Sequence, residues 1–175
     1  MARKEENTIN FILRNWIPSD AGAIAELNNS EIPQVSALSS DALIRLAKQF
    51  VYFKIFESPE GKIAGFLIAL NESAIYDSLN FQWFRAHYPR FTYIDRIVIS
   101  VEARRKGLGK LFYEDVQTFA SGRSPILACE VNLDPPNASS MGFHRHHGFS
   151  EVGIQKTEGG KKTVSLLVKN LPVEN

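Results

Sequence analysis

The stretch VEARRKGLGKLF, residues 101–112, combines two glycines with four basic side chains near the middle of the chain. The preceding residues, YIDRIVIS, read as a β-strand, and the following residues, EDVQTFA, read as a helix. A helix that begins near Gly107 presents unpaired backbone N–H groups and the positive end of its dipole. Glycines at such a start let an anion approach the backbone, and phosphates are the usual ligands. The stretch therefore predicts a strand–turn–helix unit that binds a pyrophosphate.

Two common nucleotide-binding motifs do not fit this turn. A P-loop requires G-x-x-x-x-G-K-[ST], but Gly109-Lys110 is followed by Leu111, and no glycine stands at the required offset. A dinucleotide fingerprint, G-x-G-x-x-G, requires glycine where Phe112 stands. The pattern that remains is R-x-x-G-x-G, residues 104–109.

The rest of the chain alternates between predicted strands and helices. Cap sequences at 18–20 and 39–41 predict helices over 21–29 and 42–49. The long connection over 71–90 is expected to hold a helical turn, whose Trp83, Phe84 and Tyr88 either pack or wall an acceptor pocket. Further helices are predicted over 107–121 and 138–147, in the order βααβββαβαββ, which indicates an α+β (α/β) sheet with helices on its faces. The predicted strands are 11–16, 51–58, 62–70, 91–100, 124–133, 149–157 and 161–170.

Composition limits the function. The chain has 175 residues, of which 44% are hydrophobic, so we expect one domain over 1–175 with flexible ends at about 1–9 and 170–175. The net charge of +1 gives no global attraction to nucleic acid or membrane, and no partner of either kind is expected. The single Cys129 suits a reducing compartment, and the charged N-terminus is no secretory signal. A cytoplasmic protein is therefore expected.

A second motif follows the next predicted strand. The segment NASSMGFHRHHGF, residues 137–149, is similar to a motif of a known protein family, N-x-x-[AS]-x-x-[FL]-Y-x-x-x-G-F. It occupies that pattern with Asn137, Ser140, Phe143, His144, Gly148 and Phe149. With R-x-x-G-x-G upstream, in the same order and with one strand between, the chain resembles the GCN5-related N-acetyltransferase (GNAT) superfamily. The specific matches lie within 93–149, and the overall resemblance spans about 11–168.

The resemblance implies a fold and a co-substrate. Such proteins have a mixed, mostly antiparallel central sheet of six to seven strands, in which the fourth and fifth strands splay apart. The pantetheine arm of acetyl-CoA (coenzyme A) lies in that gap, paired with the main chain of the fourth strand. Metal is not implied, and the histidines here lack a known metal spacing. The implied cofactor-binding residues are Ile97, Val98, Ile99, Arg104, Arg105, Lys106, Gly107, Leu108, Gly109, Lys110, Asn137, Ser140 and Phe143.

The implied reaction is direct transfer of an acyl group, usually acetyl, to a primary amine of a small molecule or peptide. An attacking ammonium must first lose a proton, so a base is useful. Asp95 is one candidate, since it shares strand parity with Ile97 and Ile99. Glu130 is the other, because an acid inside an apolar strand demands a partner or a function. Pairing with a strand neighbour such as Arg96 is the alternative for either acid.

One departure from the family pattern bears on catalysis. The family's usual acid is the Tyr of the second motif, where this chain has His144. An imidazole can donate a proton, so His144 is predicted to be the acid, and the alternative is that it only fills the cofactor channel. Because the Tyr is missing, a second hypothesis is a module that senses acyl-CoA without turnover. A third hypothesis is a general phosphate or nucleic-acid binder. A sheet-edge homodimer, common in similar folds, also stays open.

Overall fold

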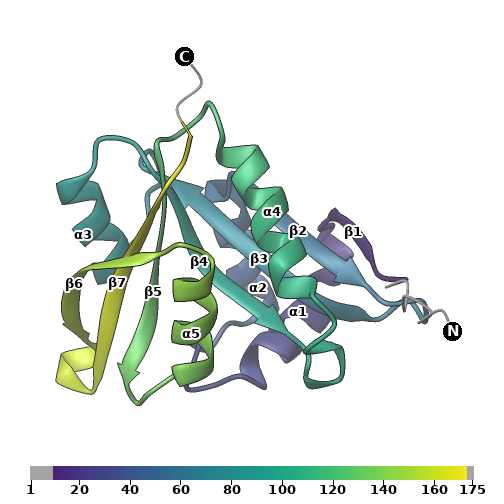
Figure 1. Cartoon of the computed structure of the whole chain (residues 1–175). Coiled ribbons are helices and arrows are strands. Elements are labelled where there is room, and N and C mark those ends of the chain that lie inside the picture. Colours follow the sequence, from purple (N-terminus) through teal and green to yellow (C-terminus); the bar gives the residue numbers. More distant parts are fainter. Residues whose placement is uncertain (1–9, 173–175) are drawn as a thin grey trace, which may run out of the picture.

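The computed structural model describes residues 10–172, and within them the strands form a single twisted sheet (Figure 1). Its order is β1-β2-β3-β4-β5-β7-β6. The strands are β1 (Ile12–Asn15), β2 (Tyr52–Glu57), β3 (Ile63–Asn71), β4 (Thr92–Ile99), β5 (Ile126–Asp134), β6 (Ser150–Thr157) and β7 (Lys162–Asn170). The helices are α1 (Ala21–Asn29), α2 (Ser40–Leu46), α3 (Leu79–His87), α4 (Leu108–Ala120) and α5 (Ala138–His146). The predicted mixed sheet with helices is confirmed.

The sheet is antiparallel except at its centre, where β4 and β5 run parallel. In the described chain these two strands pair through Thr92 with Leu127 and Tyr93 with Ala128, and then they diverge. Each keeps its outer partner beyond that point, because β4 follows β3 to Ile99 and β5 follows β7 to Asp134. The result is a V-shaped opening in the middle of the sheet (Figure 1).

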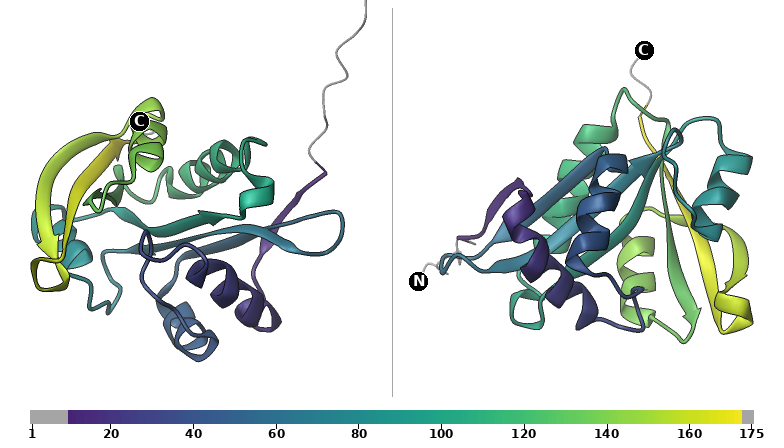
Figure 2. Two further views of the ribbon diagram at one scale, coloured as in Figure 1. Left: turned by 90° about the horizontal axis from the view of Figure 1, so that it is seen from below. Right: turned by 180° about the vertical axis from the view of Figure 1, so that it is seen from behind.

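Helices cover both faces of the sheet (Figure 2). On one face, α4 buries Leu108, Phe112, Val116 and Ala120, a spacing of one residue every four that forms an apolar stripe. This stripe and α5 pack over the cluster that contains Leu67 of β3. Helices α1 and α2 pack on the opposite side of β2 and β3. Helix α3 packs on that same side over β5 and β7, so the two halves of the sheet have separate covers.

The connection over 71–90 holds a full helix, α3, where a helical turn was predicted. The Ser78 hydroxyl caps it by accepting from the Phe81 N–H (3.3 Å), and Phe81 and Phe84 are fully buried. Trp83 stacks on His87 with ring centres 3.8 Å apart. Of the three aromatic residues proposed as packing or pocket wall, none lines the cleft described below, so within residues 10–172 they pack. The element order is therefore βααββαβαβαββ.

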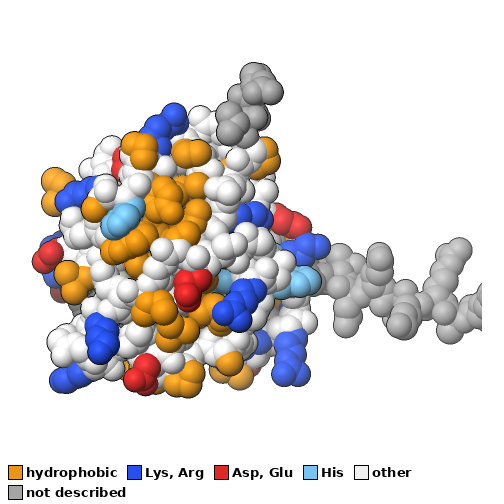
Figure 3. Space-filling model, turned by 60° about the vertical axis from the view of Figure 1, so that its left-hand side comes forward, with side chains coloured by type: hydrophobic (Ala, Val, Ile, Leu, Met, Phe, Trp, Pro, Cys, Tyr) orange, Lys and Arg blue, Asp and Glu red, His pale blue; other side chains and the backbone are white. Residues whose placement is uncertain are grey.

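The side of the molecule that carries α3 and β6 displays gathered hydrophobic side chains (Figure 3). Exposed apolar residues there include Leu79 of α3 and Val152 and Ile154 of β6. A Cβ on Gly153 would lie 3.0 Å from the Trp83 ring, so glycine allows α3 to approach the edge strand closely. This contact fixes α3 against the β6–β7 hairpin, which also flanks the cleft.

The predicted ends of the chain fall mainly outside the description. Residues 1–9 and 173–175 lie outside the described residues. At the other end Leu171 is buried and its N–H donates to the Pro125 carbonyl (2.8 Å), and the flexibility expected from about residue 170 stays a prediction. Among residues 10–172, no helix has the length and apolar character needed to cross a bilayer.

Candidate active site

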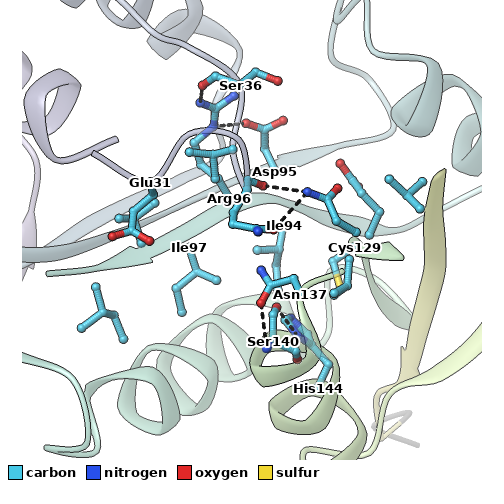
Figure 4. A pocket seen from close by; sticks show the side chains of 18 of the residues that line it. Glu31, Ser36, Ile94, Asp95, Arg96, Ile97, Cys129, Asn137, Ser140 and His144 are labelled. Carbon is cyan, nitrogen blue, oxygen red and sulfur yellow. Dashed lines mark hydrogen bonds and ion pairs between the residues drawn. The ribbon is translucent and has the colours of Figure 1, made fainter. Parts of the chain in front are cut away.

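A cleft of about 1220 Å³ lies where β4 and β5 separate (Figure 4). One end is lined by β4, the start of α4, and α5. The other end is lined by the α1–α2 loop, the segment that leads into α3, and the β6–β7 turn. All the predicted site residues line this cleft except Lys106, whose ammonium lies 5.4 Å from the ring centre of Phe11. Segments far apart in the sequence therefore meet at one site.

The edge of β4 that faces β5 is free of a strand partner beyond Tyr93 in the described chain. Ile97 and Ile99 point to the α4 face of the sheet, and Val98 points to the α1 face. An extended molecule with amide groups could therefore pair with this edge as an added strand does. The geometry suits the backbone role predicted for Ile97, Val98 and Ile99.

The glycine-rich turn contains two residues with a left-handed backbone. Gly107 has φ 81°, and Arg105 has φ 61°, both in the left-handed region. Gly107 is the N-cap of α4 and, within the described chain, no side chain caps this helix. The first N–H groups of α4 therefore point out of the helix start without helical acceptors. Arg104, Arg105 and Lys110 are exposed around them, which makes this end of the cleft a site for an anion.

The two sequence motifs touch each other through Gly109. A Cβ at this position would lie 3.2 Å from the Phe143 ring, so any larger residue would have to push that ring away for α4 to start this close to α5. Leu108, by contrast, is buried in the core, and only its backbone can serve a ligand. Asn137 caps α5 by accepting from the Ser140 N–H (3.2 Å) through its side-chain oxygen. Both Asn137 and Ser140 also line the cleft.

A β-bulge in β4 decides where Asp95 points. Ile94 pairs with Ala69 and Arg96 pairs with Ile68, which leaves Asp95 as an extra residue without a partner on β3. The bulge breaks the alternation of the strand, so Asp95 and Arg96 can share a face and form an ion pair. The strand parity expected between Asp95 and Ile97 or Ile99 is wrong for this reason. The pairing with Arg96 that was the alternative for Asp95 is observed, with Nε 2.7 Å from Oδ2.

Glu130 lies across the opening on β5, at the end of the cleft away from the glycine-rich turn. Its Oε2 accepts from the Tyr93 hydroxyl (2.7 Å). Burial raises the pKa of Glu130 to about 7, against the lowering effects of the Tyr93 hydroxyl and the Asn80 amide, and the charge of Asp95 adds to the rise. Within residues 10–172 no Lys or Arg forms an ion pair with Glu130. Glu130 is thus a carboxyl group poised to exchange a proton near neutral pH.

His144 is buried between two hydrogen-bond partners. Its Nδ1 lies 2.7 Å from the Ser140 carbonyl, which can only accept, so the proton of the neutral ring is on Nδ1. Its Nε2 therefore accepts from the Tyr113 hydroxyl. Burial lowers the pKa of His144, the Ser140 carbonyl opposes this, and the charge of His147 adds to it, so the ring is neutral at pH 7. The acid role of His144 stays a prediction, and any proton it delivers passes through Tyr113 or needs a ring turn.

No sequence pattern pointed to Tyr113 or to the contacts that the α1–α2 loop makes at the cleft. Tyr113 looks like any buried aromatic of an amphipathic helix. The α1–α2 loop reaches the cleft at Gln34, whose side-chain oxygen accepts from the Asn132 amide (3.2 Å) of β5. Glu31 of the same loop pairs with Arg104 at the anion end. These contacts depend on loop conformation, which hydrophobic periodicity does not encode.

Comparisons with known proteins agree with this architecture. Residues 23–149 match the sequence model described as the acetyltransferase (GNAT) family. No curated protein sequence matches the chain significantly.

In the described residues, no group of three or more His, Cys, Asp and Glu side chains is placed to hold a metal ion.

Solved structures share the fold at low sequence identity. The ribosomal-protein-S18-alanine N-acetyltransferase from Escherichia coli has a TM-score of 0.70 at 16% identity, over 94% of this chain and 96% of that chain. Ard1 from Thermoplasma volcanium has a TM-score of 0.75 at 12% identity, over 94% and 99%. Nourseothricin acetyltransferase has a TM-score of 0.65 at 18% identity, over 93% and 99%. At these identities the likeness concerns the fold.

Proposed function

Since the chain belongs to the acetyltransferase (GNAT) family, we propose that it transfers an acetyl group from acetyl-CoA directly to a primary amine of a small molecule or peptide. The observation that carries the proposal is the separation of β4 from β5 beside an uncapped helix start. The free edge of β4 suits the amides of a pantetheine arm, and the N–H groups of α4 suit a pyrophosphate. Similar folds include one enzyme acting on an alanine of a ribosomal protein and one named for an antibiotic, so the fold leaves the acceptor open.

The two ends of the cleft are assigned to the two substrates by charge. Arg104, Arg105 and Lys110 surround the helix start and would bind the phosphates of the co-substrate. Glu130 lies at the other end, beside the walls formed by the α1–α2 loop and the segment before α3. A positively charged ammonium would approach from that end, because a carboxylate attracts it there.

Glu130 is proposed as the base. The acceptor ammonium gives a proton to the Glu130 carboxylate, and the free amine nitrogen then attacks the thioester carbonyl carbon. The new C–N bond forms and the C–S bond breaks, while a backbone N–H on the free edge of β4 stabilises the oxyanion. The leaving thiolate takes a proton, for which the His144–Tyr113 pair is the proposed source. The nitrogen loses its second proton as the amide forms, and that proton replaces the one given to the thiolate, so one proton remains on Glu130.

Ligand binding tests the co-substrate site first. Acetyl-CoA and coenzyme A, but not ATP, should raise Tm, because a ligand at a hundredfold excess over Kd adds about 2.7 kcal/mol. For a chain of this length, that is a shift of about 5–10 °C. Gly109→Ala should lose at least half of the shift, since its methyl group presses on Phe143 at 3.2 Å. Gly142→Ala is the matched control, because it adds the same methyl group to a helix with nothing within 4 Å, and it should keep the full shift. No shift of the wild type with either coenzyme would end the proposal.

Turnover separates the enzyme from a module that only senses acyl-CoA. The protein is assayed with acetyl-CoA and a panel of four amine acceptors. These are spermidine, Nα-acetyl-lysinamide, a tetrapeptide amide with a free N-terminus, and an aminoglycoside. Release of the coenzyme thiol, with an added acetyl mass on one amine, supports the enzyme. A full Tm shift with no acetylation of any amine in the panel would favour the sensing module. That outcome is compatible with His144, since the ring is buried and both of its nitrogens have hydrogen-bond partners.

His144→Ala tests the proposed acid. We expect kcat to fall about tenfold, which is a small effect for an acid because a thiolate of pKa about 8.5 leaves with little protonation. The KM for acetyl-CoA should change less than threefold. His147→Ala is the matched control, since His147 makes the same helical bond from Nδ1 to the Phe143 carbonyl (2.8 Å) and does not line the cleft. Full turnover by His144→Ala would remove the acid role and leave the enzyme assignment intact.

A further inference from the structure

The Asp95–Arg96 ion pair lies in the wall of the cleft and has no part in the proposed proton transfer. The two side chains are 7% and 9% exposed, and the bulge brings both to one face of the sheet. Burying such a pair sacrifices the hydration of both charges and does not usually stabilise a fold. The hydrogen-bond partners of the pair come from two different walls of the acceptor end.

Arg96 holds the first wall, the α1–α2 loop. Its Nη1 donates to the side-chain oxygen of Asn28 (2.8 Å). The same nitrogen donates to the Ser36 carbonyl (3.3 Å), towards which Arg96 points in Figure 4. The Asn28 amide donates to the same Ser36 carbonyl (2.9 Å), and Asn28 is fully buried. One guanidinium thus joins β4 to the last turn of α1 and to the loop that lines the cleft at Ser36. An arginine suits this role because its donors form a rigid fork that stays charged.

Asp95 holds the second wall, the segment that leads into α3. Its Oδ1 accepts from the Tyr76 hydroxyl (2.6 Å), while Oδ2 accepts from Arg96. The Tyr76 carbonyl in turn accepts from the Gln82 amide (2.8 Å) of α3. Tyr76 lines the cleft. Both oxygens of the Asp95 carboxylate are therefore engaged, one by Tyr76 and one by Arg96, whereas Glu130 has no ion-pair partner in the described chain.

We propose that Asp95 and Arg96 are positioning residues that hold both acceptor-side walls, residues 30–39 and 72–78, at a set distance from Glu130. The inference rests on the proposed function and adds how the acceptor is recognised. The β-bulge makes this arrangement possible, because it places the two charged side chains next to each other on the face of the sheet that carries both walls. Loss of the Tyr76 link should weaken acceptor binding and leave co-substrate binding at the glycine-rich turn unchanged. Loss of the Arg96 link should weaken acceptor binding and can also alter the co-substrate site, because residues 30–39 include Glu31, the ion-pair partner of Arg104.

Tyr76→Phe tests the link to the second wall. It should raise KM about tenfold for the best amine of the panel, with kcat within threefold and KM for acetyl-CoA unchanged. Tyr52→Phe is the matched control, because it removes the same kind of bond, from a Tyr hydroxyl to Asp115 (2.7 Å), away from the cleft. Equal effects of the two variants on acceptor KM would overturn the proposal.

Asp95→Asn separates positioning from proton transfer. The variant should keep a rise of kcat with pH, at a lower pH than in the wild type because the charge of Asp95 raises the pKa of Glu130, together with a raised acceptor KM. If that rise disappears and kcat falls a hundredfold or more, Asp95 is the base and the proposal is wrong. If Asp95→Asn is too unstable to assay, Tyr76→Phe is the deciding variant. It removes the hydroxyl that donates to Asp95 and leaves the Asp95–Arg96 ion pair intact.

Hydrogen–deuterium exchange gives a readout that needs no acceptor. Asn28→Ala should speed exchange over residues 30–39 at least tenfold, and Tyr76→Phe should do so over 72–78. Tyr52→Phe should leave both segments unchanged. Unchanged exchange in the first two variants would refute the proposal even if acetyl-CoA binds. Faster exchange in a protein that acetylates none of the panel would instead uphold the anchoring and count against the proposed function.

Discussion

Glu130→Gln is expected to lower kcat by about a hundred- to a thousandfold, because the variant cannot accept the proton of the acceptor ammonium. The wild-type kcat should fall about tenfold per pH unit below pH 7, since protonation of a carboxyl group with a pKa of about 7 removes the base. In the variant this dependence should disappear. Initial rates across pH 5.5–9 with saturating acetyl-CoA measure both effects.

Two controls make this result specific. Glu151→Gln alters a carboxylate that accepts from the Ser165 hydroxyl outside the cleft, and it should keep full kcat and the pH dependence. Folding stability is the second control. The folded pKa of Glu130 is raised above its ordinary value, so its contribution to stability is lost as pH rises from about 4 through 7. Glu130→Gln should therefore be at least as stable as the wild type at pH 8. A kcat within threefold of the wild type would transfer the base role elsewhere.

Phe112→Ala should destabilise the fold by about 3–5 kcal/mol, because it leaves a cavity in a core that cannot fully close. Phe112 is fully buried on α4, its ring centre lies 4.6 Å from that of Phe56, and the ring rests against the backbone of Gly65. Urea unfolding with a shared slope measures the loss of stability. The neighbour on the exposed side provides the control, since Leu111→Ala should cost less than about 1 kcal/mol. Similar losses in the two variants would mean that α4 does not pack as described.

Locally encoded features were predictable from the sequence. The glycine-rich turn and α4 follow from the left-handed backbone at Gly107 and from an apolar stripe repeated every four residues. The Asn137 cap and the strands around it are likewise properties of neighbouring residues. Phosphate binding was predicted from the same local rules, because a helix start carries its own unpaired donors. The family resemblance rests on these short segments, and the sequence match over 23–149 supports it.

The tertiary structure alone decided which acid is free and which is paired. Sequence parity placed Asp95 beside Ile97, but one extra residue in the pairing of β4 with β3 turned it towards Arg96. No local pattern marks that bulge, because it depends on how β3 aligns with β4. The partners of His144 and Glu130 come from Tyr113 and Tyr93, on other elements. Side-chain protonation follows burial and neighbours, and both exist only after segments distant in the sequence have packed together.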